Sequence, residues 1–311
     1  MCLISYVLKK NIAKSMPSRH DGSPYLKCKS VEDFPGLKAT PFSFYSKKLK
    51  LNGFRYFYDV PTFKGVVVFF HGAGNGHLAY ITEINSFAKE GYLVYAYDNS
   101  FCGASEGEGF WNFSSSLVDQ KYFFEFLDKD EPALNLKRYA SGHSWGGFTA
   151  LASLSDPKYK IEKVVEFSGF TSVLELFLLY QPNLKGISWI LKIMQHRYFG
   201  KLGNLDCLKI LKNTDKKVLM VHGDKDATVP YEKVFLRAQS ALEDRKNINF
   251  LVVKDRHHQP YFSISAQTYY LDLINQGVPL GKVNPLPEID YDKLTEEDPL
   301  VMKTVFDFLS N

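Results

Sequence analysis

Short apolar runs alternate with stretches of helical periodicity along most of this 311-residue chain. The apolar runs, which read as strands buried on both faces, cover 65–70, 92–97, 137–142, 163–167, 217–222 and 247–253. The helical stretches cover 80–90, 115–127, about 145–155, 231–244 and 300–309. This alternation predicts one large α/β domain with a mostly parallel central sheet flanked by helices.

A β-hairpin is predicted before this alternation begins, over residues 43–60. Alternating apolar positions lead to Leu51, and the chain continues from Phe54 as a second strand. Between them lies Asn52-Gly53, the pair favoured in two-residue turns because both positions need positive φ. We therefore expect the hairpin to turn at Asn52-Gly53.

Residues 171–214 interrupt the rhythm, because they contain apolar helical segments and no predicted strand. An insertion of this size between two strands is typical of a lid or cap over an active site. Its apolar residues either line a route for substrate or pack against the sheet, and they include Leu176, Phe177, Leu178, Tyr180, Trp189 and Ile190. We expect an N-terminal extension (1–40), a catalytic domain (41–170 and 215–311) and a helical cap (171–214) inserted after the sixth strand.

Composition is that of a globular protein, with 45% hydrophobic and 23% charged residues. Residues 1–50 carry ten basic and three acidic side chains, so a basic N-terminal face could bind an anionic membrane or an acidic partner. Basic and aromatic residues are not interleaved in the way that nucleic-acid binding would require, so we expect no nucleic-acid partner. The four cysteines have no zinc-like spacing, and no apolar run reaches the length of a membrane span or has the order of a secretory signal. We expect a cytoplasmic protein without an integral membrane segment, a metal or a cofactor; its oligomeric state is open.

The candidate chemistry centres on the pentapeptide Gly142-His143-Ser144-Trp145-Gly146. It lies where an apolar strand ends and a helix begins, which is the setting of a nucleophile elbow. Glycines that flank the serine allow the sharp turn, and the helix N-terminus favours developing negative charge. Ser144 is the predicted nucleophile.

In order along the chain, further segments resemble the α/β-hydrolase family over residues 45–310. The strand 66–70 with His71-Gly72-Ala73-Gly74 resembles the third strand and oxyanion loop, and Tyr95-Ala96-Tyr97-Asp98 with Gly103, Ser105 and Gly107 resembles the following glycine-containing loop. The segment 218–226 with Val229-Pro230 is similar to the one that carries the acid, and 252–260 to the one that carries the histidine. The chain is most similar to the small bacterial serine hydrolases that include monoacylglycerol-lipase-like esterases.

This resemblance implies a catalytic triad of Ser144, Asp226 and His258, in the chain order that the fold requires. Histidine would accept the serine proton, and the acid would hold the imidazole in the correct tautomer. Asp226 aligns better with the family than Asp224, which is expected in a turn, and Glu166 and Glu175 are remote alternatives. His258 is preferred over the adjacent His257. We expect His71, His143 and His222 to make structural hydrogen bonds.

The oxyanion hole is expected from the backbone amides of Ala73 and Trp145. Phe177, Tyr180 and Trp189 are the predicted substrate-binding side chains. The expected reaction is hydrolysis of a small or medium, largely uncharged acyl ester through an acyl-enzyme on Ser144. Cleavage of a peptide, thioester or carbon–carbon bond is the alternative among enzymes, because one fold supports many reactions. A non-catalytic binding protein of the same fold, or a peripheral membrane protein, is the alternative from another class.

Overall fold

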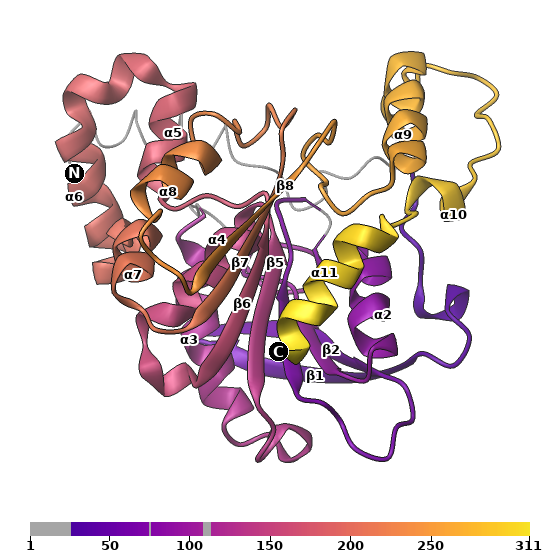
Figure 1. The fold of residues 1–311 in the computed structure, drawn as a ribbon, viewed down its shortest axis with the longest axis horizontal. Helices are drawn as coiled ribbons and strands as arrows, with labels where there is room; N and C mark the ends of the chain where they lie inside the picture. Colours follow the sequence, from indigo (N-terminus) through magenta and orange to yellow (C-terminus); the bar gives the residue numbers. More distant parts are fainter. Residues whose placement is uncertain (1–25, 75, 108–112) are drawn as a thin grey trace.

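A computed structural model describes residues 26–74, 76–107 and 113–311. Its centre is an eight-stranded sheet with the order β1-β2-β4-β3-β5-β6-β7-β8 (Figure 1). Strands β3 to β8 run parallel to one another, and β2 runs antiparallel to both of its neighbours, β1 and β4. The strands are β1 (Lys38–Ser46), β2 (Leu49–Phe57), β3 (Val66–Phe70), β4 (Leu93–Tyr97), β5 (Arg138–His143), β6 (Ile161–Phe167), β7 (Lys217–Gly223) and β8 (Ile248–Val253). The predicted α/β-hydrolase fold is confirmed.

Helices follow most strands and cover the two faces of the sheet. The α-helices are α2 (Ile81–Lys89), α3 (Ser115–Leu127), α4 (Trp145–Ala152), α5 (Val173–Tyr180), α6 (Ser188–Phe199), α7 (Cys207–Asn213), α8 (Phe235–Ala241), α9 (Ile264–Gln276), α10 (Tyr291–Leu294) and α11 (Pro299–Ser310). The 3₁₀-helices are η1 (Val31–Asp33), η2 (His77–Tyr80), η3 (Glu131–Ala133), η4 (Ser153–Ser155), η5 (Pro157–Tyr159), η6 (Pro182–Ile187), η7 (Gly200–Asn204) and η8 (Val278–Leu280).

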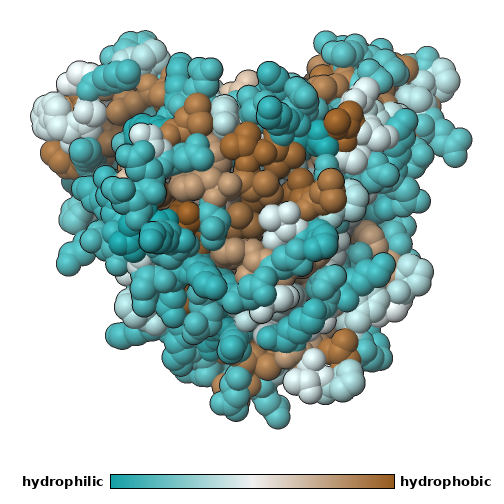
Figure 2. Space-filling view, in the orientation of Figure 1, coloured by the Kyte–Doolittle hydropathy of each residue, from teal (hydrophilic) through white to brown (hydrophobic). Residues whose placement is uncertain are grey.

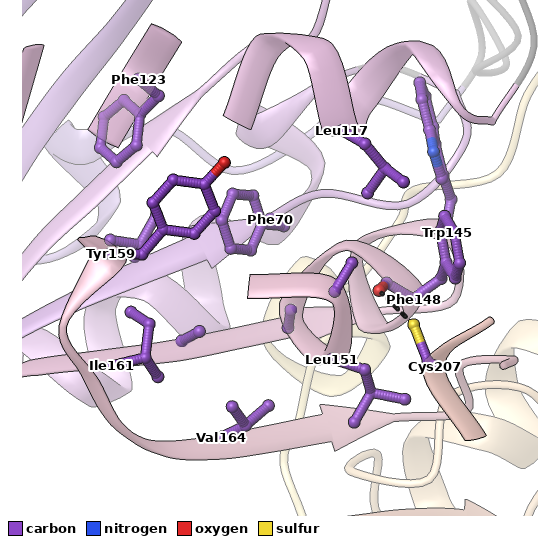
Figure 3. Packing of buried hydrophobic residues seen from close by; sticks show 14 of the residues in the cluster. Phe70, Leu117, Phe123, Trp145, Phe148, Leu151, Tyr159, Ile161, Val164 and Cys207 are labelled. Atoms are coloured by element: carbon purple, nitrogen blue, oxygen red, sulfur yellow. Dashed lines mark hydrogen bonds between the residues drawn. The ribbon is translucent and has the colours of Figure 1, made fainter. Parts of the chain in front are cut away.

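Two hydrophobic layers, one on each face, hold the helices against the sheet. Strand residues that alternate along β3 to β7 point to opposite faces, so each strand contributes to both layers. One layer packs against α3, α4, α7 and α8, and it includes Trp145 and Phe148 of α4 (Figure 3). The other packs against α2 and α11. The sheet is therefore buried on both sides, which explains the continuous apolar runs of its parallel strands.

The hairpin exists, but its predicted turn is wrong. The chain turns at Lys47 and Lys48, and Asn52-Gly53 lies inside β2. Gly53 pairs with Phe42 of β1 on one side and with Tyr97 of β4 on the other. A Cβ on Gly53 would lie 2.4 Å from the Ala96 carbonyl oxygen, so the glycine allows close strand approach rather than a turn.

Helix α8 is shorter than the predicted 231–244 segment. In its first turn, the amide of Leu236 donates to the carbonyl of Tyr231, five residues back, instead of four. This spacing breaks the α-helical register between Pro230 and Phe235. The loop that follows β7 is correspondingly longer, and it carries Asp226 and Val229.

The segment between β6 and β7 contains α5, η6, α6, η7 and α7, as the absence of a predicted strand implied. Its ends meet, because the amide of Cys207 donates to the carbonyl of Thr171 at 2.8 Å. Helices α5 and α6 share a small apolar cluster of their own around Leu174, Leu191 and Met194. Helix α7 instead packs on the main core, where the Cys207 thiol donates to the Phe148 carbonyl of α4 (Figure 3). The helices α5 and α6 project at one side of the molecule (Figure 1).

Strand β8 forms one edge of the sheet, and its Phe250, Leu251 and Val252 are only partly buried. Hydrophobic side chains gather on this face between β8 and α11 (Figure 2). Within the described ranges, no helix combines the length and apolar character needed to cross a bilayer. Most of the predicted N-terminal extension, residues 1–25, lies outside the described residues; its described part leads through η1 into β1.

Candidate functional site

Ser144 occupies a strained turn between β5 and α4. Its backbone has φ +56° and ψ −115°, in a region that L-residues rarely adopt. The turn brings backbones so close that a Cβ on Gly142 would lie 2.4 Å from the Gly146 carbonyl oxygen. The Ser144 amide donates to the carbonyl of Phe167 at the end of β6, at 2.8 Å. The sequence therefore folds here into a turn that presents a half-buried serine at the N-terminus of a helix.

Asp226 and His258 come from the loops after β7 and β8 and meet at the same edge of the sheet. The Nδ1 atom of His258 lies 2.8 Å from Oδ2 of Asp226. The other carboxylate oxygen, Oδ1, accepts the amides of Thr228 at 2.8 Å and Val229 at 2.9 Å. Burial alone would raise the pKa of Asp226, but hydrogen bonds from His222 and His258 hold it well below its usual range. Asp226 is therefore an ionised carboxylate that fixes the orientation of the His258 ring.

His143, the residue before Ser144, connects the elbow to His258. Its Nε2 lies 2.7 Å from the backbone carbonyl of His258, and Tyr80 Oη lies 3.0 Å from its Nδ1. Since a carbonyl only accepts, Nε2 carries the proton and Nδ1 accepts from the Tyr80 hydroxyl. Burial and the neighbouring His258 lower the pKa of His143 to about 3, so the ring is neutral. The rings of His143 and His258 are 4.6 Å apart between centroids.

These contacts join the candidate base to His143, the residue next to the candidate nucleophile. Among the described residues, no hydrogen bond joins the Ser144 hydroxyl directly to His258. Catalytic hydrogen bonds of this kind are often long without substrate and shorten when it binds. The Asp226–His258 pair is thus formed in the structure, whereas a hydrogen bond from the Ser144 hydroxyl to His258 is not.

The two residues predicted for the oxyanion hole come from different segments, the start of α4 and the loop after β3. Trp145 is the first residue of α4, and its indole Nε1 donates to the Phe113 carbonyl at 2.7 Å. Ala73 is exposed in the loop after β3. His71 braces that loop, because its Nε2 accepts the Asn99 amide at 2.9 Å and its Nδ1 contacts the Gly72 carbonyl.

The alternative acids and base have other partners. Asp224 accepts the Asp255 amide at 2.7 Å, as expected of a turn residue, and the exposed Glu175 forms an ion pair with Arg237. The amide of His257 donates to Gln267, and its side chain is exposed. Glu166 is fully buried near α4 and does not bond to an imidazole. The geometry thus favours Asp226 and His258 over these alternatives.

The predicted substrate-binding side chains have different surroundings. Phe177 packs in the apolar cluster of α5 and α6, and Trp189 is 61% exposed. The Tyr180 hydroxyl donates to the carbonyls of Ala227 and Thr228, next to Asp226. Tyr180 therefore connects the predicted cap to the loop of the candidate acid, and substrate contact by these three residues stays a prediction.

Two buried groups near the site were not predicted as part of it. His222 makes the structural hydrogen bond expected of it, with the Val229 carbonyl at 2.9 Å, and its Nε2 also lies 3.2 Å from Oδ2 of Asp226. The signal available in the sequence was the four-residue spacing from His222 to Asp226 at the end of a strand. Asp98 bonds to the buried His77, which sequence reasoning did not single out. The parts of the chain that the structure describes contain no group of three or more His, Cys, Asp or Glu residues able to hold a metal.

Comparison with known proteins adds two kinds of similarity. A family model described as serine aminopeptidase, S33 matches residues 61–204, slightly under half of the chain. No curated protein matches. Among solved structures, the Pyrococcus furiosus esterase Pf2001 is 19% identical and covers 86% of this chain and 97% of its own, with a TM-score of 0.59.

Two further solved structures have similar sequence identities and TM-scores. The α/β hydrolase GrgF from Penicillium sp. sh18 is 14% identical, covers 88% of this chain and 98% of its own, and has a TM-score of 0.58. Acetyl xylan esterase 1 from Thermoanaerobacterium sp. is 16% identical, covers 91% and 99%, and has a TM-score of 0.56. At these identities the similarity shows a shared fold, and function has to be argued from the site.

Proposed function

Because this chain belongs by its fold to the α/β-hydrolase superfamily, we propose that it is a serine hydrolase that cleaves carboxylic esters through an acyl-enzyme on Ser144. One observation carries the proposal. Ser144 is held at φ +56° at a strand-to-helix turn, and its neighbour His143 contacts the His258 carbonyl of the Asp226–His258 pair, which is joined at 2.8 Å. A backbone strained in this way is stable only when its surroundings enforce it, and such strain is common at active sites.

The three side chains divide the reaction between them. Nε2 of His258 accepts the Ser144 proton as Oγ bonds to the ester carbonyl carbon, and later returns it to the leaving alcohol oxygen. Asp226 keeps the other proton of the ring on Nδ1 and stabilises the imidazolium. Since its pKa is lowered, Asp226 remains ionised through this step. Water then attacks the acyl-enzyme by the same route and releases the acid.

The oxyanion that develops on the carbonyl oxygen needs hydrogen-bond donors. The amides of Trp145 and Ala73 are the proposed donors, since amides at a helix N-terminus and in the loop after β3 suit this role. Helix α4 adds the positive end of its dipole. Loss of one such donor typically lowers kcat by about 10²–10³-fold.

The substrate we infer is a small or medium, largely uncharged acyl ester. The predicted cap is rich in apolar side chains, and some of them are exposed, including Tyr180, Trp189 and Ile193. Apolar walls favour acyl groups without charge, because a charge moved there would lose hydration. A chain-length series of p-nitrophenyl esters, measured beside amide and thioester controls, tests this part of the proposal.

Labelling with a fluorophosphonate probe tests the nucleophile. The probe is expected to modify wild-type protein at Ser144 and to leave Ser144→Ala unlabelled. Ser153→Ala is the matched control, because Ser153 lies at the far end of the same helical segment and bonds to the Ala150 carbonyl. Labelling that persists in Ser144→Ala would exclude Ser144 as the nucleophile.

Peptide-bond cleavage is a second candidate, because the matching family model is described as serine aminopeptidase. The same triad would attack an amide carbonyl, and His258 would protonate the leaving amine. Aminoacyl p-nitroanilides distinguish the two: faster turnover of these than of matched p-nitrophenyl esters would favour the peptidase. A folded protein that turns over neither class and is not labelled would instead be a binding protein.

A further inference from the structure

A buried imidazole connects the turn of the candidate nucleophile to the loop of the candidate base. His143 is the last residue of β5 and stands directly before Ser144. Its side chain is buried, and its Nε2 lies 2.7 Å from the backbone carbonyl oxygen of His258. The two residues are far apart in the sequence, so this contact joins the sheet to the loop after β8.

Tyr80, at the end of η2, contacts the same imidazole at its other nitrogen. The Tyr80 Oη lies 3.0 Å from Nδ1 of His143. Tyr80 also lies against the loop that leads to Ala73, because a Cβ on Gly72 would be 2.4 Å from Oη. Burial raises the pKa of Tyr80, and a backbone hydrogen bond from Gly72 opposes this rise, so Gly72 donates its amide to the phenol oxygen. One hydroxyl thus contacts both the proposed oxyanion loop and His143.

The contacts of His143 and Tyr80 define where their protons lie. A carbonyl oxygen only accepts, so Nε2 of His143 carries a proton. Burial and the neighbouring His258 lower the pKa of His143 to about 3, so the ring is neutral and its Nδ1 has a lone pair. Since burial raises the pKa of Tyr80, the phenol keeps its proton and donates it to Nδ1.

This arrangement argues against His143 as the general base itself. Its Nε2 already carries a proton that is donated to a carbonyl, and its Nδ1 already accepts from Tyr80. A base needs a free lone pair within reach of the serine hydroxyl. The imidazole of His143 therefore acts on the reaction, if at all, through the residues that it holds.

The location of the His258 ring depends on more than its bond to Asp226. That bond, at 2.8 Å, fixes the orientation of the ring at Nδ1. His258 itself lies in the loop between β8 and α9, outside the hydrogen-bonded strands. The bond from His143 to its carbonyl ties this loop to β5. Because a misplacement of about 1 Å can cost about 10²-fold in rate, such a tie matters for proton transfer from Ser144.

We propose that His143 and Tyr80 are positioning residues for the catalytic base. His143 holds the His258 backbone at a set distance from the Ser144 turn, and Tyr80 fixes the orientation of the His143 ring and ties it to the loop of Ala73. The proposal rests on the proposed function for the roles of Ser144 and His258. Neither side chain gives up its proton: both act only by holding their neighbours in place.

The rings around His143 restrict its movement further. The Tyr261 ring packs edge-on against it, with 5.4 Å between centroids, and the Tyr80 ring is tilted at 5.7 Å. Tyr261 is itself buried, at 2% exposure. In a closely packed interior a ring enclosed in this way has little freedom to turn, so its two nitrogens keep their partners.

Spectroscopy tests the arrangement without any activity measurement. Long-range ¹H–¹⁵N spectra of the full chain labelled with ¹⁵N-histidine report the His143 tautomer, and the His143 signals are those missing in His143→Gln. At about pH 7 we expect a neutral ring with its proton on Nε2, because the pKa is about 3. In Tyr80→Phe the Nδ1 signal should move to the position of an unbonded acceptor.

Tyr58→Phe is the matched control for these spectra, because it removes a tyrosine hydroxyl that bonds to Asn85 of α2 instead. The His143 signals should stay in place in this variant. An imidazolium, an Nδ1–H tautomer or an Nδ1 signal that does not move in Tyr80→Phe would overturn the proposal.

Kinetics with p-nitrophenyl acetate, expressed per folded molecule, test the positioning role. His143→Leu removes the donor to the His258 carbonyl, and we expect kcat to fall about 10- to 100-fold with KM little changed, as for other partners that orient an essential group. His143→Gln should recover most of this loss, because its amide nitrogen stands as far along the side chain as Nε2. Tyr80→Phe should lower kcat about 5-fold, the effect of one neutral hydrogen bond, and Tyr58→Phe should leave it unchanged.

Three kinetic results would overturn the proposal. The first is wild-type kcat in His143→Leu. The second is a rise in KM at unchanged kcat, which would indicate substrate binding instead of positioning. The third is a His143→Gln variant as slow as His143→Leu, which would show that the imidazole only fills space.

Failure of this inference and failure of the proposed function are distinguishable. If wild-type protein shows neither ester turnover nor fluorophosphonate labelling, the proposed function fails, and the positioning role fails with it, whatever tautomer the spectra show. If wild-type protein is active and labelled but the spectra or the variants give one of the contrary results above, the inference fails and the proposed function stands.

Discussion

Asp98, directly after β4, is a buried carboxylate surrounded by donors. Its Oδ1 accepts the His77 amide at 2.8 Å and lies 2.7 Å from His77 Nδ1, while its Oδ2 accepts the Ala104 amide at 2.8 Å. Burial alone would raise the pKa of Asp98, but the hydrogen bonds and charge of His77 lower it from 3.8 to about 2. Asp98 thereby holds η2 and the loop after β4 together beside the Ala73 loop.

A lowered pKa in the folded state means that the Asp98 charge stabilises the fold above the ordinary pKa, and that this contribution is lost as the pH falls from about 4 to about 2. The shift corresponds to about 2 kcal/mol. We expect Asp98→Asn to lower the free energy of unfolding by about that amount at pH 7 and to flatten its decline below pH 4. Urea unfolding of both proteins at pH 7 and below pH 4 measures these free energies. If the free energy of unfolding declines equally in acid for wild type and Asp98→Asn, the prediction is contradicted.

At the scale of elements, the elbow depends on contact between the first turn of α4 and the end of β3. A Cβ on Gly146 would lie 1.9 Å from the Phe70 carbonyl oxygen and 2.8 Å from that of His71. Since both atoms belong to the backbone of a buried strand and its loop, neither can move without displacing the sheet. The second glycine of the pentapeptide is thus required by packing between elements.

We expect Gly146→Ala to destabilise the protein by about 3 kcal/mol or more, at the upper end for overpacked sites, and to remove fluorophosphonate labelling of the folded fraction. Thermal unfolding with labelling measures both effects. Gly186→Ala in η6 is the matched control, because a Cβ there meets nothing within 4 Å. Equal melting temperatures for the two variants would show that α4 can shift.

At the scale of the whole molecule, the predicted cap is connected to the loop after β7 that carries Asp226. The Tyr180 hydroxyl, at the end of α5, donates to the Thr228 carbonyl, and the Thr228 amide donates to Asp226 Oδ1. Movement of α5 is thereby coupled to the loop that holds the candidate acid. Tyr180 is 53% exposed, so this hydrogen bond adds little to stability.

We expect Tyr180→Phe to leave the melting temperature nearly unchanged, with a cost of about 1 kcal/mol or less. Its kcat/KM for esters should fall about 2- to 5-fold, because Asp226 and the cap become less well ordered. This fall corresponds to a loss of about 1 kcal/mol or less in transition-state stabilisation. Tyr45→Phe, at a 64% exposed position on β1, is the control for hydroxyl loss at the surface. If both variants behave alike, the cap does not act through this contact.

The order of strands and helices, and the position of Ser144, follow from local pattern because buried strands are apolar throughout and a sharp turn needs glycine. The turn at Asn52-Gly53 is wrong because it, too, was inferred from local pattern. The pair favours a turn locally, but Gly53 lies in β2 between the neighbouring strands β1 and β4. Contact with β4 is not visible in a local pattern, so there tertiary packing overrides propensity.

By itself, the sequence determined the α/β fold and the strand-to-helix position of Ser144, since periodicity and turn chemistry are local properties. Asp226 and His258 were expected from the resemblance to the α/β-hydrolase family. Only the tertiary structure decided which groups meet. It brings His258 rather than His257 to Asp226, directs His143 to the His258 carbonyl, and places Nε2 of His222 3.2 Å from the same carboxylate. These contacts join β5, β7 and the loop after β8, and their geometry exists only once the strands lie side by side.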